Sequence, residues 1–438
     1  MMDDAELQKQ AEQVLQLNAR DSYTVPAEPL YPHQWLWDSA FISIGLRHID
    51  STRAKNELLS LLDAQWSNGM IPHVIHHGKD KGRDGNIWRS WMNPHAPESI
   101  STSGITQPPI LAEAVLRVAD SLKKHERKSW LKLVYPNLAR YHQWLYADRD
   151  PHNEGLVLQI HPWETGLDNT PPWMHELHDH QLPLWIQAVK SMRLSPLFNL
   201  FRNDTKIIPA HERMTTIDAL ALYSVQRRLR RKNYDIKRIL AHSLFAIEDV
   251  SFNAILLRNN QLLRDIAEEI KQPIDEQLAE DIARAESAFE QLWDPYSSQY
   301  YSREFVSHRL LKQPSIGTLI ALYSGTIPQK NADQLVKTLE DEQMFGPPYP
   351  VPSVPVGSDW FQEHTYWQGP TWINANWLII DGLERYGYKD HADALKQSTI
   401  EMLKRHGCFE YFSPLDGSPA GAQNFSWSAA LAIDLLNQ

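Results

Sequence analysis

The feature that most constrains the fold of this chain is a helical spacing of apolar residues, which recurs over most of its 438 residues. Apolar side chains return every three or four positions in segments that include 5–19, 108–122, 177–192, 234–246, 252–270 and 426–437. Most connections between these segments are short. This pattern predicts helical hairpins packed in layers or in a ring, and it does not favour a parallel α/β sheet.

Signals for strands are few, and they fall at 156–160 and around 300–301. Long stretches without helical spacing run over 67–106, 148–172 and 342–370. Loops of this length inside a helical domain are usually functional or disordered. Because these are rich in Trp, Pro, Gly and His rather than in Ser and Lys, we expect ordered loops that gather on one face of the molecule.

The organisation of the chain predicts one domain over residues 1–438, since no Gly/Ser-rich linker or low-complexity tract divides it. A single cysteine, Cys408, excludes an internal disulfide, and we interpret it as a small buried residue. The acidic N-terminus lacks the pattern of a secretory signal, and no apolar stretch approaches the roughly 18 residues that span a bilayer. We therefore expect a cytoplasmic, reduced protein without a membrane partner.

Charge and aromatic content narrow the function. The formal net charge is −11, whereas nucleic-acid-binding proteins usually carry a basic surplus, so we expect no nucleic-acid partner. The chain has 16 Trp and 16 Tyr. Most of these rings are expected in the core, but flat apolar faces with a polar edge also suit pyranose sugars.

Two acidic residues stand among aromatic and rigid neighbours. Asp168 begins the sequence Asp-Asn-Thr-Pro-Pro-Trp, with no Lys or Arg within ten positions on either side. Poor solvation raises the pKa of a carboxyl group and makes it a proton donor near neutral pH, although a helix cap would explain Asp168 alone equally well. Glu410 lies in Phe-Glu-Tyr-Phe. Two shielded carboxyl groups in a tryptophan-rich chain favour chemistry at a glycosidic bond.

Two aromatic clusters, at 31–41 and 366–377, each precede a predicted helix. Helix capping would explain the acid in the first cluster, but it would not explain the rings that arrive with it. We interpret both clusters as walls of a sugar-binding pocket, in which rings cover the apolar face of the sugar and a carboxylate binds hydroxyl groups. The candidates in them are Tyr31, Trp35, Trp37, Asp38, Tyr366, Trp367 and Trp372.

The blocks Trp35–Ser39, Gly166–Trp173, Tyr366–Asn374 and Phe409–Phe412 together resemble the signature of glycoside hydrolase family 63. The resemblance is greatest to its short bacterial members, the mannosylglycerate and glucosylglycerate hydrolases, and it extends over nearly the whole chain. It implies an all-α fold, an (α/α)6 barrel with long loops on the active-site face. It also implies inverting hydrolysis of a small α-glucoside or α-mannoside, such as glucosylglycerate or mannosylglycerate.

The same resemblance assigns roles to residues. It implies that Asp168 is the general acid, that Glu410 is the general base, and that Asp38 stays ionised and holds sugar hydroxyl groups. It implies no cofactor and a small-molecule glycoside as the partner. It places these residues around the substrate: Tyr31, Trp35, Trp37, Asp38, Gln107, Arg202, Tyr366, Trp367, Trp372 and Gln423.

A metal centre is not predicted. The histidines at 73, 76 and 77 lack a Cys partner, and they do not form a helical His-x-x-x-His pattern with a nearby Glu, so they do not fit a zinc site.

Other functions remain open at this stage. The loop over 76–91 looks longer than in the relatives, and it is locally basic through Lys79, Lys81, Arg83 and Arg89. It could attract a carboxylate on the leaving group or be a solvated surface loop, so the leaving group could also be neutral, as in glucosylglycerol or a trehalose-like disaccharide. A sugar epimerase would need a His pair near the sugar, and a non-catalytic sugar-binding protein would not need both acids.

Overall fold

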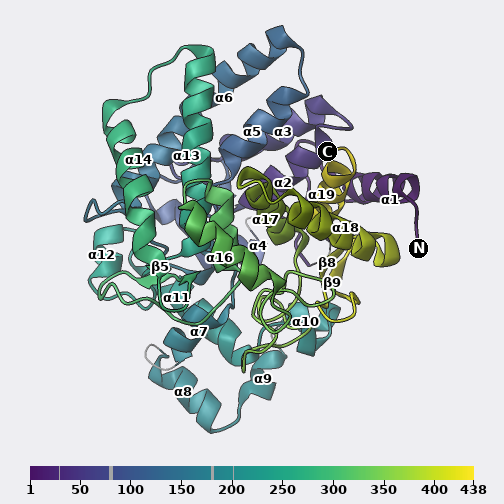
Figure 1. The fold of residues 1–438 in the computed structure, drawn as a ribbon. Helices are drawn as coiled ribbons and strands as arrows, with labels where there is room; N and C mark the ends of the chain where they lie inside the picture. The colour runs from purple at the N-terminus through teal and green to yellow at the C-terminus, as the bar shows by residue number, and fades with distance from the viewer. Residues whose placement is uncertain (29, 78–81, 179–181, 201) are drawn as a thin grey trace.

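A computed structural model describes residues 1–28, 30–77, 82–178, 182–200 and 202–438, and it is mostly helical (Figure 1). One series of helices occupies the centre, and each member contacts the next. The last helix also contacts the first, so the series closes on itself. Its members are α2 (Leu36–Leu46), α5 (Leu111–Asp120), α13 (Val250–Ile270), the consecutive α15 (Gly317–Ile320) and η6 (Ala321–Ser324), α17 (Ile373–Arg385) and α19 (Ser426–Leu436).

A second set of helices packs around the outside of this central series. Each outer helix contacts a central helix near it in the chain, apart from α1, which packs on α19 and so brings the two ends of the chain together. The outer helices are α1 (Asp4–Leu17), α3 (Ser51–Leu62), α6 (Lys124–Arg149), α14 (Glu276–Ala288), α16 (Gln329–Glu340) and α18 (Lys389–His406).

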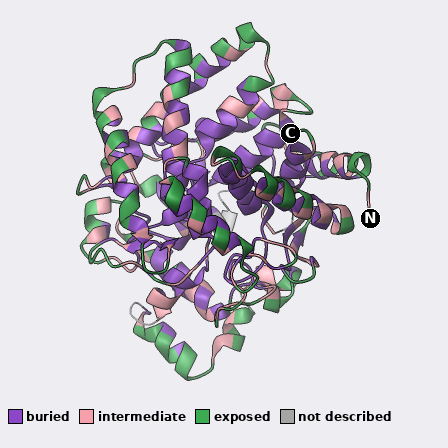
Figure 2. Cartoon of the chain, viewed as in Figure 1, coloured by how far each residue is buried: buried purple, intermediate pink, exposed green. Residues whose placement is uncertain are grey.

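Burial explains which helices lie inside. Every residue of α2 is buried, and so is every residue of α19 except Leu436. A helix that is apolar around its whole circumference must be covered on all sides. The outer helix α3 instead alternates buried and exposed positions, and Figure 2 shows the outer helices with exposed outward faces around a buried centre.

The central helices α2 and α19 approach each other very closely at Gly45. A Cβ atom on Gly45 would lie 2.3 Å from the carbonyl oxygen of Ala430. Because Cβ atoms essentially never come so near a backbone atom, only glycine allows this packing distance.

Short antiparallel strands lie between the helices. One sheet joins β1 (Gln34–Trp35), β2 (Val74–His76) and β3 (Ser101–Thr102) in that order. Another pairs β8 (Phe409–Phe412) with β9 (Pro419–Gln423), with Phe412 opposite Pro419 and an irregular register between Phe409 and Tyr411. The remaining pairs are β4 (Ile247–Glu248) with β7 (Arg303–Glu304), and β5 (Trp293–Asp294) with β6 (Gln299–Tyr300).

Between α6 and α13 the chain forms a lobe of mostly short helices, and those over 184–199 project at the lower edge of Figure 1. It contains α7 (Pro171–Glu176), α8 (Leu184–Ser191), α9 (Ser195–Asn199), α10 (Asp204–Ile207), α11 (Thr216–Arg231) and α12 (Ile236–Leu240). The short α4 (Gly82–Trp88) packs on α11.

Some local predictions were wrong. The segment 156–160 is not a strand, because its only ladder contact is an isolated bridge between Gln159 and Ile247. The N–H of Val157 instead donates to the side chain of Asn253 at 2.9 Å. Within the described part of 177–192, α8 covers Leu184–Ser191 and residues 182 and 183 are not helical, and the helix predicted over 234–246 is reduced to α12.

The strand predicted around 300–301 is present as β6. Among the described residues, no helix has the length and apolar character required to cross a membrane.

The packing at Gly45 leads to a test of stability. We expect Gly45→Ala to lower the free energy of unfolding by about 1–3 kcal/mol, since the added methyl group would force α2 and α19 apart. The measurement is the thermal unfolding midpoint of the variant against the parent. Ser43→Ala serves as the control, because it changes a small buried residue of the same helix without adding an atom. An equal effect of the two substitutions would contradict the steric explanation.

Candidate active site

A cavity of about 540 Å³ opens at the end of the central helices where the long loops lie. All three long loops contribute to its wall, through Val74 and Trp88, through Trp163 and Asp168, and through Tyr366. The expectation that these loops gather on one face is therefore confirmed.

The structure brings most of the predicted site residues to this one wall. They come from distant parts of the chain, including the start of α2, strand β8 and the lobe. Those that line the cavity are Tyr31, Trp35, Trp37, Asp38, Gln107, Asp168, Arg202, Tyr366, Trp367 and Glu410.

Two predicted residues, Trp372 and Gln423, do not line the cavity. Trp372 is fully buried and stacks on the far side of Trp367, with ring centroids 3.8 Å apart and planes inclined by 2°. Gln423 is exposed at the end of β9, where it pairs with Phe409. Trp372 can therefore act on the cavity only through the lining residues that it contacts, which include Trp367, Tyr366 and Trp427.

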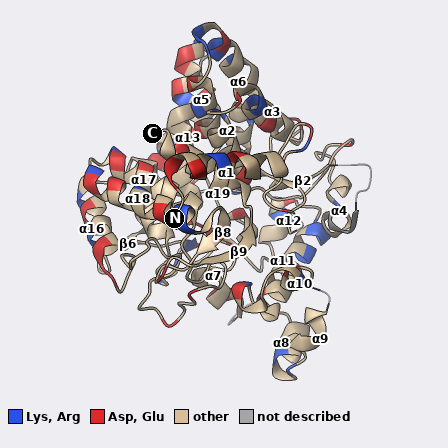
Figure 3. Cartoon of the chain, turned by 90° about the vertical axis from the view of Figure 1, so that its right-hand side faces the viewer, with Lys and Arg blue, Asp and Glu red and all other residues tan. Residues whose placement is uncertain are grey.

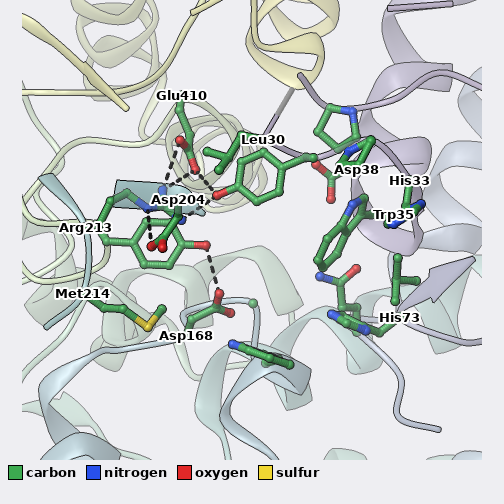
Figure 4. Close-up of a pocket in the computed structure, with 18 of the residues that line it drawn as sticks. Leu30, His33, Trp35, Asp38, His73, Asp168, Asp204, Arg213, Met214 and Glu410 are labelled. Carbon is green, nitrogen blue, oxygen red and sulfur yellow. Dashed lines mark hydrogen bonds and ion pairs between the residues drawn. The ribbon is translucent and has the colours of Figure 1, made fainter. Parts of the chain in front are cut away.

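Asp168 lies in the turn before α7. Thr170 occupies the N-cap of this helix, so the capping explanation for Asp168 does not hold. The hydroxyl of Tyr366 donates to Oδ2 of Asp168 at 2.9 Å (Figure 4). Burial, helped by the nearby charge of Glu410, raises the pKa of Asp168 to about 7, although the Tyr366 hydrogen bond and Arg213 act in the opposite direction. Asp168 can therefore carry a proton near neutral pH.

Glu410 has a different environment, at the register irregularity of β8. Its Oε1 accepts from the hydroxyl of Tyr31 at 2.7 Å, and its Oε2 accepts from the N–H of Ala422 at 2.9 Å. Nη1 of Arg213 lies 3.2 and 3.3 Å from the two oxygens. Three donor groups thus reach the two oxygens of Glu410, and one of them is a guanidinium.

The backbone opposite Glu410 has no room for a side chain. Gly421 has a φ of +74°, and a Cβ atom on it would lie 2.7 Å from Oε2 of Glu410. A glycine here permits both the left-handed backbone and the position of the carboxylate.

Asp38 is buried in the first turn of α2, but Trp35 is the N-cap, so Asp38 does not cap the helix. Burial, together with the charges of Glu410 and Asp168, raises the pKa of Asp38 well above its ordinary value. This differs from the expectation that Asp38 stays ionised. Hydroxyl groups that donated to its carboxylate would favour the charged form again.

Arg213 is the main site residue that sequence reasoning missed. It is 6% exposed, its Nη2 donates to the Tyr31 hydroxyl at 2.8 Å, and its guanidinium lies over the ring of Tyr366 at 4.2 Å. It thus contacts the residues that hold each of the two acids. It follows a short 3-10 turn outside every aromatic block, and nothing in the local sequence distinguished it from other basic residues of the lobe.

Arg202, which was predicted, lines the same side of the cavity. Its Nε and Nη2 bind the two oxygens of Asp204 at 3.1 and 2.5 Å. Asp204 also lies 3.7 Å from Nε of Arg213.

Histidines and the cysteine offer little further chemistry. Burial lowers the pKa of His73, a cavity residue, well below its ordinary value, and burial raises the pKa of Cys408 to about 12. Cys408 is buried, as its interpretation as a small core residue requires. Within the described part of the chain, no group of three or more His, Cys, Asp or Glu side chains is arranged to hold a metal ion.

Part of the loop over 76–91 lines the cavity, through His76, Ile87 and Trp88, and the neighbouring Arg89 is exposed. Lys79 and Lys81 lie outside the described residues, as does the side chain of Arg83. Figure 3 shows the molecule from the right-hand side of Figure 1, with the described Lys and Arg residues in blue and the described Asp and Glu residues in red.

Comparison with known proteins gives full-length similarities. The family model for the mannosylglycerate hydrolase MGH1-like glycoside hydrolase domain matches residues 31–428. Mannosylglycerate hydrolase of Thermus thermophilus is 37% identical over 97% of this chain and 99% of its own length. Glucosylglycerate hydrolase of Mycolicibacterium hassiacum is 30% identical over 98% of each chain. A crystal structure of a family 63 mannosylglycerate hydrolase from Thermus thermophilus in complex with Tris and D-glycerate is 35% identical, covers 98% of this chain and 99% of its own, and superposes with a TM-score of 0.87.

The raised pKa of Asp168 predicts a pH-dependent gain in stability for Asp168→Asn. The folded protein holds the Asp168 proton up to about pH 7, whereas the unfolded chain releases it near the ordinary value of 3.8. The parent therefore loses stability as the pH rises between these two values, and an amide at this position does not. The measurement is the thermal unfolding midpoint of Asp168→Asn minus that of the parent. We expect this difference to be more positive at about pH 8 than at about pH 4.5, by about 2 °C or more.

The control for this measurement is Asp120→Asn, which changes an exposed carboxylate far from the cavity. A stability difference between Asp168→Asn and the parent that stayed constant over the same pH range would contradict the buried-acid assignment.

Proposed function

The chain belongs to the family of mannosylglycerate hydrolase MGH1-like glycoside hydrolases, within glycoside hydrolase family 63, and on this premise we propose that it hydrolyses a small α-mannoside or α-glucoside of glycerate. The observation that carries the proposal is the placement of Asp168 and Glu410 on one cavity in opposite environments. Relatives named for mannosylglycerate and for glucosylglycerate support the choice of substrates.

In the proposed reaction, protonated Asp168 donates its proton to the glycosidic oxygen while the bond from that oxygen to the anomeric carbon breaks. Glu410 takes a proton from a water molecule whose oxygen bonds to the anomeric carbon from the opposite face. The products are the free sugar and glycerate. A pair of this kind works because the two environments separate the protonation states of the acids. An inverting reaction requires a carboxyl separation of roughly 6.5–9.5 Å, to leave room for the water.

We assign the sugar to the part of the cavity beside Asp38. The rings of Trp35, Trp37 and Trp367 offer apolar faces there, and Gln107 and Asp38 offer polar groups for the hydroxyls. Sugar hydroxyl groups that donate to Asp38 would compensate for its burial. Arg202 is the proposed partner of the glycerate carboxylate, since a guanidinium binds a carboxylate through paired hydrogen bonds.

The proposed scaffold is a single (α/α)6 barrel over residues 1–438. The closed series of central helices and the helices packed around it support this arrangement, as does the length of the family match. For such an enzyme we propose a cytoplasmic location, where small charged glycosides would be its substrates.

The acid–base assignment predicts severe losses of activity. Asp168→Asn and Glu410→Gln should each lower kcat by about 10²–10⁴-fold, because general acid or base catalysis contributes a factor of that size. Release of free sugar from a panel of glycerate, glycerol and disaccharide α-glycosides is the assay, and it also separates acidic from neutral leaving groups. Glu401→Gln, which alters an exposed ion pair of α18, is the control and should retain activity. A decrease in kcat of less than about tenfold in either site variant would contradict the assignment of that residue.

The inverting mechanism predicts the configuration of the product. An α-glycoside should release the β-anomer first, since water attacks from the face opposite the leaving group. Proton NMR in the first minutes of the reaction, before mutarotation, distinguishes the anomers. Initial release of the α-anomer would require a retaining mechanism with a nucleophile in place of the general base.

A further inference from the structure

A continuous series of ion pairs runs along one wall of the cavity, from Arg202 in the lobe to Glu410, the proposed general base. Arg202 binds Asp204 through two contacts at 3.1 and 2.5 Å, Asp204 lies 3.7 Å from Nε of Arg213, and Arg213 binds Glu410 at 3.2 Å. Side-chain exposure is 12% at Arg202 and 25% at Asp204, and it falls to 5% at Arg213 and 1% at Glu410. The series therefore runs from partly exposed members to a buried carboxylate, and Figure 4 shows Asp204, Arg213 and Glu410.

At its inner end, Glu410 is contacted by three donor groups, which crowd the positions that a water molecule could use. A carboxylate offers about four positions for hydrogen-bond donors. Tyr31 and the N–H of Ala422 each use one, and Nη1 of Arg213 contacts both oxygens. If one of these donors withdraws, Glu410 gains a position for the water from which it takes a proton. The N–H of Ala422 is fixed in β9, so the side chains are the donors that can withdraw.

Arg213 has an alternative partner and a free position for it. Its Nε is buried without a hydrogen-bond partner, and the nearest carboxylate to it is that of Asp204. Asp204 is engaged by Arg202, and although burial opposes them, the hydrogen bonds and charges of Arg202 and Arg213 lower the pKa of Asp204. Asp204 is therefore a carboxylate shared between two guanidinium groups, that of Arg202 on the side of the lobe and that of Arg213 beside Glu410.

We propose that Asp204 couples the carboxylate of the leaving group to the catalytic base. First, the substrate carboxylate binds Arg202, and Asp204 loses Arg202 as its partner. Asp204 then binds Arg213, and Arg213 withdraws from Glu410. Glu410 keeps Tyr31 and Ala422 as donors and has room for a water molecule. Each guanidinium keeps one carboxylate throughout, so no buried cation is left unpaired, a state that would be costly. The one negative charge that the substrate brings frees one carboxylate, that of Glu410.

This inference rests on the proposed function, and it makes Asp204 a positioning residue that acts through Arg213. It predicts that the charge of the leaving group changes kcat as well as KM. In the parent, kcat on the glycerate glycoside should exceed kcat on the glycerol glycoside of the same sugar by about tenfold, within the range usual for coupled sites.

Asp204→Asn tests the coupling, because it keeps the size of the side chain and removes its charge. It should lower kcat on the glycerate glycoside about tenfold, to the value for the glycerol glycoside, and it should not raise KM, since Arg202 becomes free to bind the substrate carboxylate. On the glycerol glycoside its kcat should stay within about twofold of the parent. Asp204→Glu, which restores the charge, should recover part of the difference, and Asp120→Asn, which alters an exposed Asp–Arg pair of α5, is the control.

Three results would overturn the coupling. They are equal kcat values of the parent on the two glycosides, a proportional loss on both glycosides in Asp204→Asn, and a raised KM with unchanged kcat. A parent enzyme that cleaves other small α-glycosides but no glycerate glycoside would remove the proposed substrate, and the coupling with it. An enzyme that cleaves the glycerate glycoside but shows one of the three results retains the proposed function and loses only the role of Asp204.

Discussion

The contact between α2 and α19 is the constraint on which the rest of the structure depends. It joins a helix near the start of the chain to the last helix, at a distance that only Gly45 allows. Asn18 reinforces the same junction, since its Nδ2 donates to the carbonyl of Asn424 and to the hydroxyl of Ser426. The catalytic candidates follow from this closure, because Tyr31 meets Glu410 across 379 positions of sequence. A looser contact would separate the aromatic wall before α2 from the acid in β8.

The closure gives the two acids unequal surroundings on one cavity. Asp168 receives a neutral phenol hydroxyl and little else, and burial therefore favours its protonated form. Glu410 receives a phenol hydroxyl, a backbone N–H and a guanidinium. Arg213 lies between them and stacks on the ring whose hydroxyl reaches Asp168. The difference between proton donor and proton acceptor thus arises from how many donors each acid has, although both are enclosed by aromatic residues.

The sequence predicted the helices and most of the cavity wall, because both leave local traces. Apolar spacing identifies a helix such as α13, and blocks in which an acid stands among aromatics identify Asp168 and Glu410. Contacts made in three dimensions leave no such trace. Trp372 and Trp367 belong to the same block, and only the fold determines which ring faces the cavity. Arg213 is important because of partners that are distant in sequence, such as Glu410. The segment 156–160 was expected to pair with a neighbouring strand, but the side chain of Asn253 binds it instead.

The stacked pair of Trp367 and Trp372 has a consequence for the thermodynamics of binding. The ring of Trp372 stacks on the ring of Trp367. The backbone N–H of Trp367 donates to Oδ1 of Asn169 at 3.0 Å, which fixes the main chain at this residue. A ring held in this way has already given up its rotational freedom when the protein folds, so a sugar that lands on it does not have to restrict it further. Trp372, which does not line the cavity, would thereby lower the entropic penalty of binding a ligand on the ring of Trp367.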